Sequence, residues 1–297
     1  MIRNHIRLQT AFALLVISYF VVPQHAIAVC KSGTVCTCPD CPQVDRTLWQ
    51  GRWFVLETAN FQICCEDSDS PAEHLAGHAE SLRKELRAKW LGDVSSATWK
   101  PRCQILLYSS QRSYVAAVGR GSERTVGSSL VDVDKGRITK RRIDLLGRST
   151  EYLSAALPHE LTHVILKDRF AATALPRWAD EGMAILADTD AKQERHFKVL
   201  QKAFTSRTTF HVAELLTLED YPSPSRFGTF YGQSASLAKF LVLRKSPEQF
   251  AAFIERASSD GYDTALQECY GISGPADLDW QWRQHIDSVQ MATLDGG

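Results

Sequence analysis

The spacing of apolar residues along this 297-residue chain changes character near residue 150. Before that point short β-rich runs alternate with helical stretches, and beyond it apolar residues recur at helical spacing. This order predicts an α+β protein, in which a mixed α/β subdomain with a small sheet (residues 51–149) precedes a mostly helical subdomain (residues 150–297). In the first half, strands are predicted at residues 53–56, 61–63, 103–108, 126–133 and 137–146, and helices at 72–91 and 111–118.

The second half contains a series of predicted helices, and the first of them includes Pro158. A proline in a helix interior removes a backbone hydrogen bond and costs about 3 kcal/mol. Either the helix therefore begins at Pro158, with residues 150–157 as a separate piece, or it bends there. The predicted helices span residues 150–170, 177–187, 191–204, 212–218, 229–245, 247–257, 262–270 and 275–289.

The last predicted strand carries three consecutive basic residues, Lys140-Arg141-Arg142. In one interpretation they form the solvated face of an edge strand. In the other, the exposed edge accepts an extended peptide as an added strand. We favour the first interpretation, and both place this strand at an edge of the sheet.

The N-terminal residues resemble a secretory signal peptide. Arg3 and Arg7 precede an apolar run from Phe12 to Val22, and Ala26-Ile27-Ala28 supplies a small-residue cleavage pattern. We expect residues 1–28 to be removed by cleavage after Ala28, which predicts a secreted or periplasmic protein. The run is too short to span a bilayer comfortably, so no stable membrane span is expected after cleavage.

All eight cysteines follow that predicted cleavage position. Four of them (Cys30, Cys36, Cys38 and Cys41) lie in residues 29–50, which we interpret as a Cys-rich leader. An even number of cysteines in an exported chain favours disulfide bonds. A small metal site in the leader is the alternative. A bridge from Cys64 or Cys65 to Cys103 is a further possibility if their strands lie close together.

Charge excludes one class of partner. Lys and Arg together number 34, and so do Asp and Glu. Because there is no basic excess, we expect no nucleic-acid partner.

The sequence His159-Glu160-Leu161-Thr162-His163 has the spacing of a metal-dependent hydrolase. On a helix, residues four apart lie on one face, so the two imidazoles can bind one zinc ion. Glu160 can then reach a water bound to that ion. His74 and His78 have the same spacing, but Leu75 stands where the base would be, and we interpret this pair as surface histidines.

A third ligand is expected further along the chain. Asp180 and Glu181 lie in an apolar segment with Trp178 and Met183, where a buried carboxylate needs a cation or a metal. Glu181 is the favoured ligand, and Asp180 is the alternative.

The two segments together, His-Glu-x-x-His at 159–163 and Trp-x-x-Glu-Gly-x-Ala at 178–184, resemble those of the gluzincin metallopeptidases, the peptidase MA-like group. The resemblance implies that Glu181, on a second helix, is the third Zn²⁺ ligand and that the helical half is zincin-like. It also implies an oxyanion-stabilising Tyr or His further on, for which Tyr231 is the candidate and His211 the second choice. The family's usual Glu-x-x-x-Asp spacing is absent because residue 185 is Ile, so the partner of His159 is open.

Metzincins fit less well, because Leu166 and Arg169 stand where that group has Gly and His. The exopeptidase signature of gluzincin aminopeptidases is also absent, which favours an endopeptidase. The sequence therefore predicts a secreted zinc-dependent peptidase acting on peptide or protein substrates, with Glu160 as the general base for a zinc-bound water. The alternative is a non-catalytic, zinc-stabilised envelope or binding module.

Overall fold

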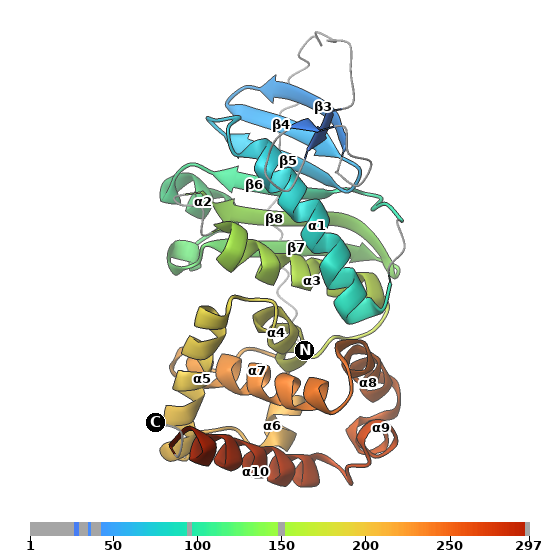
Figure 1. Ribbon diagram of the computed structural model, residues 1–297, viewed down its shortest axis with the longest axis vertical. Coiled ribbons are helices and arrows are strands. Elements are labelled where there is room, and N and C mark those ends of the chain that lie inside the picture. The colour runs from blue at the N-terminus through green and yellow to red at the C-terminus, as the bar shows by residue number, and fades with distance from the viewer. Residues whose placement is uncertain (1–26, 30–34, 37–42, 94–96, 148–151, 295–297) are drawn as a thin grey trace, which may run out of the picture.

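The computed structural model describes residues 27–29, 35–36, 43–93, 97–147 and 152–294. A mixed β-sheet with helices on its faces lies against a mostly helical C-terminal region (Figure 1). The predicted α+β fold class is therefore confirmed. Ile27 and Ala28 begin the first strand, and the rest of the predicted signal peptide lies outside the described residues, as do Cys30, Cys38 and Cys41.

The described part of the sheet has the strand order β2-β1-β3-β4-β5-β6-β8-β7. The pairs β5–β6 and β6–β8 are parallel, and the other neighbours are antiparallel. The strands are β1 (Ile27–Val29), β2 (Val35–Cys36), β3 (Gln43–Gln50), β4 (Trp53–Thr58), β5 (Phe61–Glu66), β6 (Cys103–Tyr108), β7 (Gly127–Asp134) and β8 (Arg137–Leu146). Because β3 pairs with β4, the sheet extends into the segment predicted as a leader.

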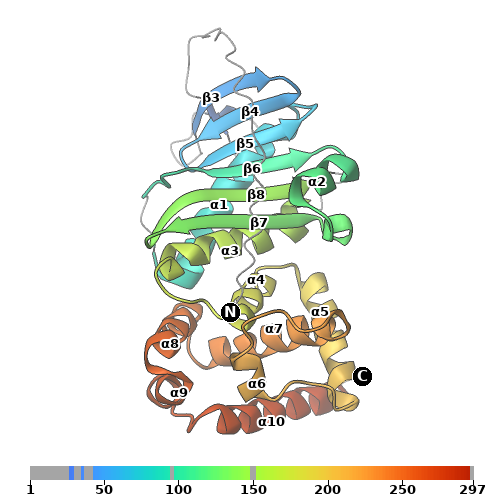
Figure 2. The same ribbon diagram turned by 180° about the vertical axis from the view of Figure 1, so that it is seen from behind.

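One face of the sheet carries the main core. Ile63, Ile105 and Ile143 lie side by side on β5, β6 and β8 and are fully buried. Two helices cover this face, α1 (Ala72–Leu91) and α3 (Leu157–Phe170), whereas α2 (Gln111–Val118) packs on the opposite face (Figures 1 and 2). Period-two alternation of side chains in the strands produces this division, because successive residues point to opposite faces.

The strand with three basic residues, β8, is not at an edge. It lies between β6 and β7, so both edge interpretations of Lys140-Arg141-Arg142 were wrong. Arg141 points into the core side, is only 6% exposed, and forms an ion pair with Asp168 of α3 at 2.7 Å. Arg142 pairs with Asp144 on the other face. The edge strand is β7, which follows the lower border of the sheet beside the helical region (Figure 2).

The proposed bridges from Cys64 or Cys65 to Cys103 are also wrong. The parallel register places Cys103 beside Phe61, so three or more residues of strand separate the sulfur atoms along the β5–β6 pair. All three are free, buried thiols, and Cys269 is free as well.

The motif helix α3 starts at Leu157, so Pro158 lies in its first turn, where no hydrogen bond is lost. A short π-helical turn, Tyr152–Ala156, precedes it. The helix α3 thus begins one residue before the proline, and the π-helical turn leads directly into it.

The helical region is built around α7 (Phe227–Arg244), which contacts α4, α5 and α8. The approach of α4 is close, since a Cβ at Gly182 would meet the Ser234 carbonyl oxygen at 2.7 Å. Among the described residues, none of the helices is both long and apolar enough to cross a membrane. The other helices are α4 (Arg177–Ile185), α5 (Asp190–Thr205), α6 (Val212–Leu216), α8 (Pro247–Asp260), α9 (Tyr262–Tyr270) and α10 (Pro275–Leu294).

Candidate metal centre

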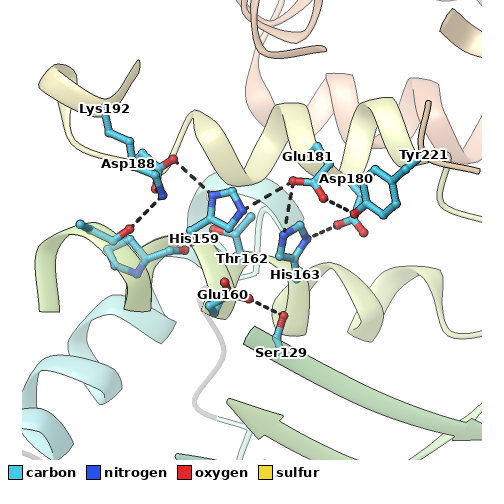
Figure 3. A network of polar contacts seen from close by, with 12 residues as sticks. Ser129, His159, Glu160, Thr162, His163, Asp180, Glu181, Asp188, Lys192 and Tyr221 are labelled. Atoms are coloured by element: carbon cyan, nitrogen blue, oxygen red, sulfur yellow. Dashed lines mark hydrogen bonds and ion pairs between the residues drawn. The ribbon is translucent and has the colours of Figure 1, made fainter. Parts of the chain in front are cut away.

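His159 and His163 of α3 face Glu181 of α4 (Figure 3). The Oε2 atom of Glu181 lies 3.6 Å from Nε2 of His159 and 3.9 Å from Nε2 of His163. One ligand atom from each of the three residues lies within 4.8 Å of the others, a spacing that suits a single ion. The structure thus brings together the three residues that the sequence predicted as ligands.

Packing of the two helices sets this geometry. The other face of α3 is buried in the core through Leu161, Val164 and Ile165, so its two histidines turn toward α4. On α4, Trp178 and Met183 are fully buried, and their packing fixes the position of the helix. The side chain of Glu181 is only 8% exposed. A carboxylate at that depth requires compensating charge or hydrogen bonds.

Each histidine is held by a carboxylate on its outer nitrogen. Nδ1 of His163 lies 2.6 Å from Oδ1 of Asp180, and Nδ1 of His159 lies 3.2 Å from Oδ2 of Asp188. With Nδ1–H donated to these carboxylates, Nε2 is the nitrogen that faces Glu181, and it is the atom left to bind a metal once the imidazole is neutral. Asp180 is therefore placed as the partner of His163, and Glu181 occupies the third ligand position.

The sequence did not identify Asp188 as the partner of His159. It lies beyond the end of α4, three residues past the position where the family spacing places an aspartate. Its side chain is fully buried and also accepts a hydrogen bond from Lys192 Nζ at 2.8 Å. Lys192 additionally donates to the Ala155 carbonyl oxygen, so the partner of His159 is tied to the turn before α3.

Electrostatics show that the site favours a cation. Burial opposes charge on both imidazoles, yet Asp180 and Glu181 raise the pKa of His163 to about 10. Hydrogen bonds to Asp188 and Glu181 raise the pKa of His159 as well, again against burial. Burial works against ionisation of Glu181 too, but the two imidazoles and Tyr221 lower its pKa to about 2. Two nitrogens and one carboxylate oxygen fit a divalent metal ion.

We predict that metal binding releases a proton. Because the pKa of His163 is raised to about 10, the metal-free site holds a proton there at neutral pH and above. A ligating imidazole must be neutral, so the incoming metal ion displaces that proton. Calorimetric titration near pH 8 in buffers of different ionisation enthalpy should show about one proton released per metal ion. Binding without proton release would contradict the raised pKa of His163.

Glu160 lies on the opening side of the centre. Its Oε2 atom accepts a hydrogen bond of 2.7 Å from Ser129 Oγ on β7 (Figure 3). A Cβ at Gly127 would come within 2.9 Å of Glu160 Cγ, so the edge strand runs close past this carboxylate. Glu160 is outside the three-residue cluster and is free for a role other than metal ligation.

An open cleft gives access to these groups. It is lined by residues of β7, α3, α4 and α5, together with Tyr221 and Tyr231. The predicted oxyanion candidate Tyr231 therefore borders the cleft, and burial with the nearby Glu181 raises its pKa to about 12. The second choice, His211, is exposed at the start of α6 and is not among the residues that line the cleft.

Tyr221 is a contact that the sequence did not predict. It lies in the Pro-rich loop before α7, and its hydroxyl donates to Oε1 of Glu181 at 2.5 Å (Figure 3). The other histidine pair lies on α1, outside the ligand cluster. His74 is exposed, as predicted, whereas His78 is partly buried and contacts the Leu153 carbonyl oxygen.

Comparison with known proteins agrees with this geometry. A model of the peptidase MA superfamily matches residues 135–288, just over half of the chain. The match begins at the β7–β8 turn, ends in α10, and contains the whole cluster of His159, His163 and Glu181. No curated protein sequence matches the chain.

Proposed function

Since this chain belongs to the peptidase MA superfamily, and is thus a zinc metallopeptidase, we propose that it is an endopeptidase with Glu160 as its general base. The observation that carries the proposal is the cluster of His159, His163 and Glu181, which lies beside Glu160 in an open cleft. The donor set supports zinc as the metal, because two imidazole nitrogens and one carboxylate leave a position for water or substrate.

When bound, zinc supplies a Lewis acid that lowers the pKa of a water to about 7 and polarises the scissile carbonyl. Glu160 takes the proton from the attacking water and passes it to the leaving amine. The hydrogen bond from Ser129 holds one oxygen of Glu160, which leaves the other to accept the proton. Tyr231, which also lines the cleft, donates to the oxygen that gains negative charge.

An extended peptide has a place to lie along β7. This strand forms one edge of the sheet in the described residues, and Gly127, Ser129 and Val131 line the cleft. Backbone groups on a free edge can pair with a substrate strand and leave its side chains to the pockets on either side. In this proposal β7, and not residues 137–146, is the strand that receives the substrate.

Export is part of the proposal. It rests on the sequence of residues 1–28, with their basic start, apolar run and cleavage pattern. Substrates are then peptides or proteins outside the cytoplasm.

Turnover of a mixed peptide library tests the function. We expect the zinc-loaded protein to cleave internal bonds of peptides blocked at both ends, to stop when a chelator removes the metal, and to recover when zinc is returned. Mass spectrometry of the products identifies the bonds cleaved. A non-catalytic zinc-stabilised module would bind zinc and lose thermal stability with the chelator, but would cleave none of the peptides. Cleavage restricted to peptides with free ends would instead exclude the endopeptidase.

A further inference from the structure

The two carboxylate oxygens of Glu181 have different partners. Oε1 accepts a hydrogen bond of 2.5 Å from the Tyr221 hydroxyl, whereas Oε2 faces the Nε2 atoms of His159 and His163 (Figure 3). A carboxylate held by one oxygen cannot rotate freely to exchange the two. Oε2 is therefore selected in advance as the ligand atom.

The ring of Tyr221 is fixed even though 41% of the residue is exposed. The Arg177 guanidinium lies 4.6 Å from the centre of the ring. Phe227 and Phe230 contact it with centroid distances of 6.0 and 5.8 Å. A cation over one face and aromatic rings around the edge restrict the side chain from several directions.

Arg177 ties this arrangement to the ligand helix. It begins α4 and lies one helical turn before Glu181, so both residues point from the same side of that helix. Its Nε atom donates to the Glu219 carbonyl oxygen at 2.8 Å, which anchors the chain two residues before Tyr221. One helix therefore supplies the metal ligand and also holds the loop that orients it.

We propose that Tyr221 is a positioning residue for the third metal ligand, which it holds through the hydrogen bond from its hydroxyl to Oε1 of Glu181. The proposal rests on the zinc site described above, but it concerns the affinity and geometry of metal binding and not the chemistry of cleavage. Tyr231 borders the same cleft, and Glu181 has its hydrogen bond from Tyr221. The rings of the two tyrosines lie in contact, with a centroid distance of 6.3 Å, but the hydroxyl that reaches Glu181 belongs to Tyr221.

The matched variants Tyr221→Phe and Tyr231→Phe test this assignment, because each removes one hydroxyl and keeps the ring. Zinc affinity is measured by competition with a chromogenic chelator, and the ligand geometry by the visible spectrum of the Co²⁺-substituted protein. We expect Tyr221→Phe to weaken zinc binding about 10- to 100-fold and to change the cobalt spectrum. Tyr231→Phe is expected to change both much less, because the hydrogen bond to Glu181 comes from Tyr221. At saturating zinc, Tyr221→Phe should recover activity.

Wild-type zinc affinity and an unchanged cobalt spectrum in Tyr221→Phe would overturn the proposal. A second variant, Arg177→Gln, removes the cation over the ring but leaves the hydroxyl, and should weaken zinc binding in the same direction by a smaller factor. It serves as the test if Tyr221→Phe fails to fold, as judged by circular dichroism, and unchanged zinc affinity in it would then overturn the proposal. A wild-type protein that binds no zinc would instead refute the function proposed above.

Discussion

Replacing Glu160 with Gln is expected to reduce hydrolysis strongly and to leave metal binding intact. The amide has nearly the same shape but cannot take a proton from the attacking water, so kcat should fall by roughly 10²- to 10⁴-fold. Glu160 does not belong to the ligand cluster, and Ser129 can still donate to the amide oxygen. The measurements are kcat/KM on a cleaved peptide and zinc content by elemental analysis.

The variant His163→Ala is the control for this prediction, since it removes a ligand and should lose the metal together with activity. An active Glu160→Gln protein would refute the assignment of Glu160 as the base. A Glu160→Gln protein without zinc would show that the residue supports the metal site, and its inactivity would then say nothing about proton transfer.

The largest loss of stability is expected for Asp168→Asn. Asp168 lies on α3, five residues after His163, and is the centre of a partly buried charge cluster in which its own side chain is 13% exposed. Its Oδ2 atom accepts from Arg87 at 2.6 Å and from the Trp99 indole at 2.7 Å, and its Oδ1 atom accepts from Arg141 at 2.7 Å. Removing the negative charge leaves the buried Arg141 guanidinium without its ion pair, whereas Arg87 keeps its pair with Asp93. We expect a cost of about 3 kcal/mol, the lower end of the range for breaking a buried ion pair.

The measurement is the free energy of unfolding from urea titration of the metal-free protein. Glu255→Gln is the matched control. Glu255 of α8 forms an ion pair with Arg169, the residue after Asp168 on α3, but the side chain of Glu255 is 44% exposed. Exposed pairs contribute roughly 0–1 kcal/mol, so this variant should be nearly neutral. Equal losses of unfolding free energy in the two variants would show that the cluster around Asp168 stabilises the protein no more than an exposed ion pair does.

The predicted elements agree well with the structure wherever the signal is local. Apolar periodicity located α1 and the helices of the second half, because burial of one helix face repeats every three to four residues. The strand at residues 43–50 was not predicted, because the segment follows a Cys-rich stretch and has no clear strand pattern of its own. It is a strand because it pairs with β1 and β4.

The order of strands β7 and β8 depended on tertiary structure. Their hairpin is visible in the sequence, with Lys135 and Gly136 adopting positive φ at the turn. Whether β7 or β8 pairs with β6 depends on contacts between residues far apart in the sequence. The second strand takes the inner place, where Arg141 reaches Asp168 of α3.

The sequence by itself determined the centre of the site. His159, Glu160 and His163 lie within five residues, so any helix holds them in one register, and Glu181 was recognisable as an acid in a buried apolar segment. Only the tertiary structure decided their partners. Asp188, Ser129 and Tyr221 lie 29, 31 and 40 residues from the side chains that they contact. No periodic pattern links such distant positions, and only the packing of α3 against α4 and β7 brings them together.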